Sequence, residues 1–254
     1  MEAKRMTARR VALVAAAMIA LFLTSCRNEQ PPQSAPNWED KSHSTRSWIP
    51  NPTADLMSPE GTFIRAFVES WEAAQIAPGD GMYAIQAGGY PGFDHALNNA
   101  WKPEEIGGTV RLQNISVGTL YREIVELRHV GDQYTAGVCT YPSLLADQLP
   151  DGQYKSNGSA ELGRGEWITF GPDPKLADGQ QHSPMANQKG GARRPVDNVF
   201  GTWVTTRVDI AATDLPQCNK LAPGTPDDWP KPYIRMNPPR TLPPDPGWPE
   251  GSRA

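Results

Sequence analysis

Asp94 and His95 are the only adjacent acid and imidazole in this chain. Such a pair can act in proton transfer, because the carboxylate tunes the imidazole as a base near neutral pH. Adjacent residues on a helix point about 100° apart, so this spacing does not itself bring the two side chains together. We therefore expect His95 to be a surface or half-buried residue, with proton transfer as the alternative.

Other catalytic signatures are missing from the sequence. It has no Gly-x-Ser-x-Gly elbow, no His-Glu-x-x-His zinc helix and no Gly-x-x-x-x-Gly-Lys phosphate loop. A structural zinc site needs Cys or His ligands at short spacing, whereas the histidines are scattered at His43, His95, His129 and His182. We predict no metal, no cofactor and no catalytic residue. Whether the protein is an enzyme stays uncertain.

Cys26 follows a segment with the features of a secretion signal. Residues 11–23 are apolar and uncharged, and they follow a basic stretch formed by Lys4, Arg5, Arg9 and Arg10. A basic region, an apolar region and small residues before a processing site are typical of a secretory signal peptide. An apolar run of about thirteen residues is too short for a transmembrane helix, which needs roughly 20.

The residues Leu23-Thr24-Ser25-Cys26 resemble the lipobox of bacterial lipoproteins. The resemblance implies that residues 1–25 are a signal peptide, cleaved just before Cys26, and that the Cys26 thiol is diacylated. One acyl chain binds a membrane marginally, whereas two or three make attachment stable. The protein would then be held by lipid at the outer face of the cytoplasmic membrane. The alternative is an uncleaved signal anchor in which Cys26 is incidental.

The mature chain is acidic. Without residues 1–25, Lys and Arg fall from 24 to 20 and Asp and Glu from 28 to 27, which gives a net charge of about −7. This balance argues against nucleic-acid binding, which needs concentrated positive charge, and against electrostatic docking on anionic lipid. Arg193 and Arg194 could bind an anionic partner, although two solvated arginines are the simpler interpretation.

Cys139 and Cys218 are the cysteines left once Cys26 carries lipid. In an oxidising compartment an even pair is most simply a disulfide. A bridge that closes a loop of about 80 residues stabilises a fold by ~4.5 kcal/mol in the chain-entropy model. Two buried free thiols are the alternative.

Local signals predict a long helix near the start of the domain. Ser58, Pro59 and Glu60 suit a helix N-terminus. An apolar stripe at helical spacing follows, formed by Ile64, Phe67, Val68, Trp71 and Ala74. The breaker residues at 78–81 end this helix, and a short second helix is plausible over 94–101.

The spacing of apolar residues changes after residue 109, and we expect strands from there on. Their positions are around Val110, Leu112, Ile115 and Val117, then 119–130, 134–141, 166–170 and 202–210. Residues 120–127 could equally form an amphipathic helix. The tight turn at Gly131-Asp132 and the segment after it favour a hairpin.

Proline-rich ends flank one predicted domain. Residues 26–57 are expected to form the lipidated tether, and 58–218 a single α+β domain. Residues 171–195 form a long polar insertion, and 219–254 an extended tail with ten prolines. Trp38 and Trp48 in the tether are expected to dock on the domain, with the membrane interface as the alternative.

The tail contains an Arg-x-x-Pro-x-x-Pro match at 240–246, which is typical of polyproline ligands. A ten-proline tail produces such a match easily. The simpler interpretation is a stiff extension, or a segment that wraps the domain through Trp229, Tyr233 and Trp248.

The order of elements is similar to that of the NTF2-like superfamily. The resemblance rests on the helix with Phe63, Phe67 and Trp71, on the turn at 90–94, and on hairpin strands that end at Cys139 and Ile210. Many actinobacterial lipoproteins with this pattern contain such a domain. The resemblance implies one or more N-terminal helices packed on a curved antiparallel sheet in a cone. It also implies a concave pocket, for which the candidate residues are Trp71, Asp94, His95 and Arg122.

Fold alone does not assign function. We expect a lipid-anchored cell-envelope protein with a non-enzymatic binding or assembly role. A protein partner in the cell envelope would bind through 171–195 or 219–254. The alternative is a small-molecule or lipid-binding protein, or an enzyme, that uses the pocket of an NTF2-like cone.

Overall fold

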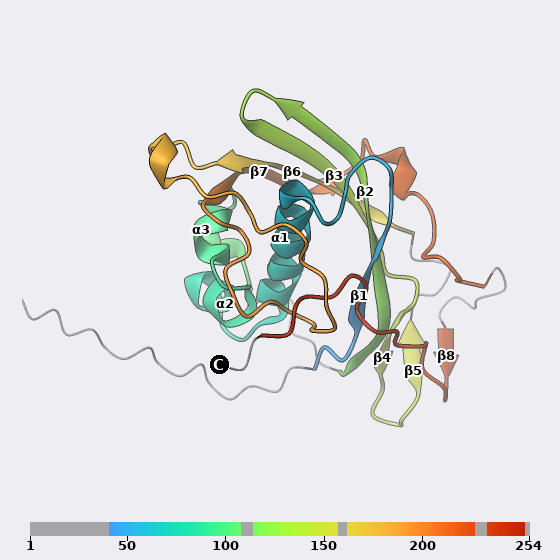
Figure 1. The fold of residues 1–254 in the computed structure, drawn as a ribbon. Helices are drawn as coiled ribbons and strands as arrows, with labels where there is room; N and C mark the ends of the chain where they lie inside the picture. Colours follow the sequence, from blue (N-terminus) through green and yellow to red (C-terminus); the bar gives the residue numbers. More distant parts are fainter. Residues whose placement is uncertain (1–40, 108–113, 157–161, 227–232, 252–254) are drawn as a thin grey trace, which may run out of the picture. The chain divides into compact units, whose positions relative to one another are not determined.

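The computed structural model describes residues 41–107, 114–156, 162–226 and 233–251. These residues form an α+β unit in which a curled, mostly antiparallel sheet surrounds one side of a group of helices (Figure 1). The predicted class, helices packed on a curved antiparallel sheet, is confirmed at this level. The described residues do not include the signal segment, Cys26, Trp38, Val110, Leu112 or Trp229.

The helix α1 (Pro59–Ile76) begins and ends where the sequence predicts. The Ser58 side chain accepts a hydrogen bond from the backbone N–H of Gly61 at 3.0 Å, and Pro59 takes the first helical position. The predicted apolar stripe is buried against the concave face of the sheet. α1 is therefore the central element of the main hydrophobic core.

Two shorter helices follow α1, and one of them was not predicted. α2 (Gly81–Gly88) begins at the last of the breaker residues and packs against α1, where a Cβ on Gly88 would overlap the backbone of Ala73. α3 (Phe93–Leu97) is shorter than the predicted 94–101. Asn98 and Asn99 end it in left-handed backbone conformations, with φ of 47° and 56°.

The sheet has the strand order β7-β6-β3-β2-β4-β5-β8, and β1 pairs with β2 in parallel. The strands are β1 (Thr45–Ile49), β2 (Ser116–Val130), β3 (Gln133–Tyr141), β4 (Leu145–Gln148), β5 (Tyr154–Ser156), β6 (Arg164–Pro172), β7 (Trp203–Ala212) and β8 (Tyr233–Arg235). One-turn 3-10 helices are η1 (Pro103–Glu105), η3 (Asp178–Gln180) and η4 (Pro216–Cys218). The strands predicted over 134–141, 166–170 and 202–210 are thus confirmed.

The long hairpin of β2 and β3 decides the ambiguity over residues 120–127, which are strand and not helix. Its turn lies at Gly131-Asp132 as predicted, with Gly131 at a φ of 61°. A β-bulge between Ile124 and Glu126 shifts the register of the hairpin. Bulges bend and twist a strand, so this one contributes to the curl of the sheet over α1.

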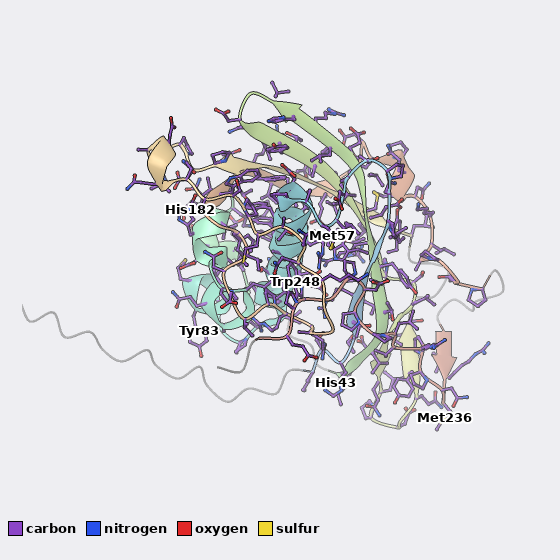
Figure 2. All side chains as sticks on the ribbon, viewed as in Figure 1. His43, Met57, Tyr83, His182, Met236 and Trp248 are labelled. Carbon is purple, nitrogen blue, oxygen red and sulfur yellow. A yellow bond between two sulfur atoms is a disulfide. The ribbon has the colours of Figure 1, made fainter. Side chains whose placement is uncertain are left out.

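The folded unit extends past 58–218 at both ends. β1 lies within the predicted tether, and its Trp48 is 2% exposed, so this tryptophan docks on the domain. Within the predicted tail, β8 pairs with β5 and Trp248 is 1% exposed beside the helices (Figure 2). Tryptophan buries a large apolar area, which outweighs the preference of proline-rich sequence for solvent.

The polyproline match at 240–246 lies against its own domain. The backbone N–H of Gly118 donates to Thr241 Oγ1 at 2.9 Å, and the N–H of Leu242 donates to Thr119 Oγ1 at 3.0 Å. This stretch of the tail is therefore attached to β2 and is not a free extension.

The polar insertion at 171–195 also packs on the domain. The N–H of Asn187 donates to the Met57 carbonyl at 2.8 Å, and Ala192 forms a β-bridge with Trp248. Figure 1 shows this segment crossing in front of the helices. The insertion thus covers the side of α1 that the sheet leaves open.

The predicted disulfide between Cys139 and Cys218 is present. It lies on the outer face of the sheet, in a second and smaller hydrophobic cluster with Tyr141, Leu215 and Ala222. It ties β3 to the segment that leads into the tail. None of the helices in the described ranges is long and apolar enough to cross a membrane.

Candidate functional site

The predicted pair Asp94 and His95 does not form a dyad. Both residues are exposed on α3, and Asp94 Oδ1 accepts from the backbone N–H of His95 at 2.8 Å. The His95 ring instead faces Asp173, with Nε2 3.7 Å from Oδ2. The helical rotation between neighbours keeps the two side chains apart, as expected.

Asp94 lines an open surface hollow of about 360 Å³ that it shares with Tyr90 and Arg194. The other two predicted pocket residues face inward. Trp71 belongs to the main core and packs edge-on against Trp101. Arg122 lies on β2, between the core residues Leu120 and Ile124, and is 3% exposed.

Arg122 is a buried cation that is only partly satisfied. Its Nη2 donates to Glu72 Oε2 at 2.6 Å, and its guanidinium lies 5.9 Å from the ring centre of Trp48. Its Nε and Nη1 are buried and have no hydrogen-bond partner among the residues that the structure describes. A buried N–H without a partner costs about 1–3 kcal/mol, so this guanidinium is the least satisfied group on the concave face that we describe.

Glu72 joins α1 to the first two strands. It accepts from Arg122 of β2 and, through both oxygens, from Arg46 of β1 at 3.0 and 3.3 Å. Burial by itself would raise the pKa of Glu72, but the two arginines outweigh burial and hold this pKa below its usual range. Glu72 therefore stays ionised and keeps Arg122 in place.

Glu166 is the second carboxyl that acts on Arg122. It lies on β6, paired with Val138 of β3, and is half-buried on the same side as the core residue Ile168. Burial raises the pKa of Glu166 to about 7, with Arg122 lowering it and Glu72 raising it. A carboxyl that titrates near neutrality beside an incompletely satisfied arginine is typical of a binding or proton-transfer site.

Arg46 also lines a cleft beside α1, which we call the arginine cleft. Its volume is about 260 Å³, and its polar walls include Arg46, Arg193 and Arg194 with Ser42, Glu69 and Tyr90. Arg194 Nη2 donates to the carbonyls of Gly88 and Gly89 at 3.1 and 2.8 Å. Arg193 Nη2 donates to the carbonyls of Ser42 and Ser44, so both arginines of the insertion are held in place and are not simply solvated.

A buried polar network behind the arginine cleft fixes the tail. Glu69 is 3% exposed and accepts from Trp48 Nε1, Tyr90 Oη and Trp248 Nε1 at 2.7, 2.7 and 2.8 Å. Arg65 is fully buried, lies 4.4 Å from the ring centre of Trp248, and donates to the carbonyls of Pro246 and Gly247. These contacts position the walls of the cleft.

Sequence reasoning missed most of these residues. Glu72 and Glu166 are charged positions next to predicted core positions, and charged side chains there usually point to solvent. The one available signal was the i, i+4 pair of Arg65 and Glu69 on the apolar side of the predicted helix.

No group of three or more His, Cys, Asp or Glu side chains suited to a metal lies within the described ranges. The chain matches no protein-family model, no curated protein and no solved structure.

Proposed function

We propose that this chain is a lipid-anchored, extracytoplasmic binding protein that holds a small organic anion at Arg122. The observation that supports the ligand is the buried guanidinium of Arg122, whose Nε and Nη1 lack partners among the described residues. An anionic oxygen satisfies such donors better than a neutral one, because charge-assisted hydrogen bonds are the stronger kind. The role is binding, not catalysis.

The charges around Arg122 favour an anion below neutral pH. Glu72 already balances Arg46, and Glu166 is largely uncharged below its pKa of about 7. Above that pH the Glu166 carboxylate competes with an anionic ligand for Arg122. Arg46 and Glu72 both stay charged across this pH range, because Arg46 lowers the pKa of Glu72 and Glu72 raises the pKa of Arg46.

The NTF2-like cone is the finer fold that we propose. It is supported by α1 against the concave face and by the long hairpin strands after it. The alternative function, an enzyme of such a cone, has one specific observation in its favour. Glu166 has a pKa of about 7 and could move a proton at physiological pH.

Binding is tested by calorimetric titration of detergent-solubilised, full-length protein with benzoate, with benzyl alcohol as the neutral control. We expect benzoate to bind at pH 6 and to bind about tenfold more weakly at pH 8, where a second negative charge faces Arg122. Glu166→Gln should abolish this pH dependence. Arg122→Gln should weaken binding by at least ~10-fold, the loss of one charge-assisted contact.

Arg128→Gln is the matched control, because Arg128 lies on the same strand and its side chain is 63% exposed. It should bind benzoate as the unmodified protein does. If Arg122→Gln fails to fold by circular dichroism, the loss of pH dependence in Glu166→Gln still tests the site. Absence of benzoate binding at both pH values, or unchanged binding in folded Arg122→Gln, would contradict the proposal.

The anchor is tested separately at Cys26. Cys26→Ser should move the protein from the membrane fraction to the soluble fraction, because acylation needs the thiol. The far-ultraviolet circular dichroism of the domain should not change. Membrane partitioning that survives Cys26→Ser would overturn the lipid anchor and favour an uncleaved signal anchor.

A further inference from the structure

We propose that the arginine cleft binds a phosphate group and is separate from the anion site at Arg122. Arginine suits this ligand, because its planar guanidinium matches phosphate oxygens and stays charged at any physiological pH. The site would hold a phosphate mono- or diester by its charged end.

The first observation is how the charges of the cleft are balanced. Glu69 is the one carboxylate among the described lining residues, and both its oxygens accept hydrogen bonds from buried tryptophan and tyrosine donors. Arg46 is balanced by Glu72, which lies outside the lining. Among the described lining residues, no further carboxylate is present to balance the charge of Arg194.

The second observation is that the guanidinium groups are fixed before any ligand arrives. Arg194 is held by the carbonyls at the end of α2 and lies 5.3 Å from the ring centre of Tyr90. Arg193 Nη2 donates to the carbonyls of Ser42 and Ser44. Side chains that are already ordered lose less entropy on binding, which raises affinity for a small ligand.

The third observation is size. A cleft of about 260 Å³ is slightly smaller than the roughly 300–1,000 Å³ of sites for drug-sized molecules. It accommodates a phosphate and its immediate substituent, and the rest of a larger molecule would extend into solvent. This fits a phosphorylated end group better than a whole apolar ligand.

The source of the phosphate follows from the position of the cleft on the chain, and this step rests on the proposed lipid anchor. Ser42 lines the cleft and comes sixteen residues after Cys26. The covalent length of sixteen residues is at most about 55 Å. The cleft would then lie within reach of phospholipid headgroups, and free phosphate is the other source of the same chemistry.

The test uses two probes on detergent-solubilised full-length protein: inorganic phosphate and dihexanoyl phosphatidylglycerol, a short-chain phospholipid. We expect at least one of the two probes to bind. The substitution Arg194→Gln should weaken that binding by at least ~10-fold. Arg193→Gln should weaken it as well. Tighter binding of the phospholipid assigns a headgroup site, and tighter binding of inorganic phosphate assigns a free-phosphate site.

Two controls make the result decisive. Arg128→Gln, on the exposed part of β2, should leave phosphate binding unchanged. Benzoate binding should survive Arg194→Gln, so a failure of this site is distinguishable from a failure of the site at Arg122.

Two results would overturn the inference. One is that neither probe binds to the unmodified protein. The other is that Arg194→Gln and Arg128→Gln bind both probes equally well.

Discussion

Replacing Glu69 with glutamine is expected to lower the free energy of unfolding by about 3–5 kcal/mol, the range for breaking a buried charged network. The Glu69 carboxylate is 3% exposed and accepts from Trp48, Tyr90 and Trp248 at 2.7–2.8 Å. Glutamine has a donor in place of one oxygen, so at least one buried N–H or O–H would face another donor. The buried cation of Arg65 would also lose its nearby counter-charge.

The change is measured by urea unfolding followed by tryptophan fluorescence. Glu104→Gln is the matched control, because Glu104 is exposed and should change stability by no more than ~0.5 kcal/mol. Trp248→Phe should account for part of the same loss, since it removes one of the three donors and keeps an aromatic ring. A Glu69→Gln variant within ~1 kcal/mol of the unmodified protein would show that the network does not hold the tail.

The elements that the sequence predicted well are those with local signals. Ser58 and Pro59 define the start of α1, and Gly131 defines the turn of the long hairpin, without reference to the rest of the chain. β1 has no such signal. It is a five-residue strand followed by proline, and its partner on β2 lies more than seventy residues away. Pairing over that distance depends on the finished sheet.

The same limit applies to the two candidate sites. Arg122 was a predicted pocket residue and does lie on the concave face, because the alternation of β2 places it between Leu120 and Ile124. Its partners Glu72 and Glu166 come from α1 and β6, and their meeting is a property of the assembled fold. A charged residue is usually exposed, so burial of this kind cannot be predicted from one sequence.

The tail illustrates how composition can mislead. Ten prolines predict an extended segment. In the structure, Thr241 and Leu242 hydrogen-bond to β2, and Asp245 forms a β-bridge with Ser47 of β1. Composition does not show where on the domain this segment docks. Trp248 inserts beside α1 because Glu69 and Arg65 provide a hydrogen-bond acceptor and a cation for its indole ring. The polar network, not the prolines, decides that this end of the chain belongs to the domain.

Removal of the Cys139–Cys218 bridge is the second large effect that we expect. The cysteines are 79 residues apart, and cross-linking such a loop stabilises a fold by about 4–5 kcal/mol in the chain-entropy model. The double substitution Cys139→Ala/Cys218→Ala should lose about this amount. The loss of stability is measured by urea unfolding. The unmodified protein under reducing conditions also lacks the bridge and should show the same loss.

On the outer face of the sheet, the bridge is accompanied by a small apolar cluster and by polar contacts. Its buried cluster holds only a few of the described residues, and the Tyr141 hydroxyl and Lys220 ammonium both donate to Glu123, at 2.8 and 2.7 Å. Lys220 is half-exposed, so its ion pair contributes little by itself. Without the bridge, the segment after β7 should detach from the sheet before the main core unfolds.

Limited proteolysis separates this outcome from global unfolding. In the double alanine variant, cleavage should appear first near residues 213–222, while the α1 core stays resistant. The matched control is Cys26→Ala, which also removes a sulfur but lies outside the loop and should leave the midpoint unchanged. Equal urea midpoints for the oxidised, reduced and double alanine forms would show that packing of Leu215 and Tyr141, and not the bridge, fixes this segment on the sheet.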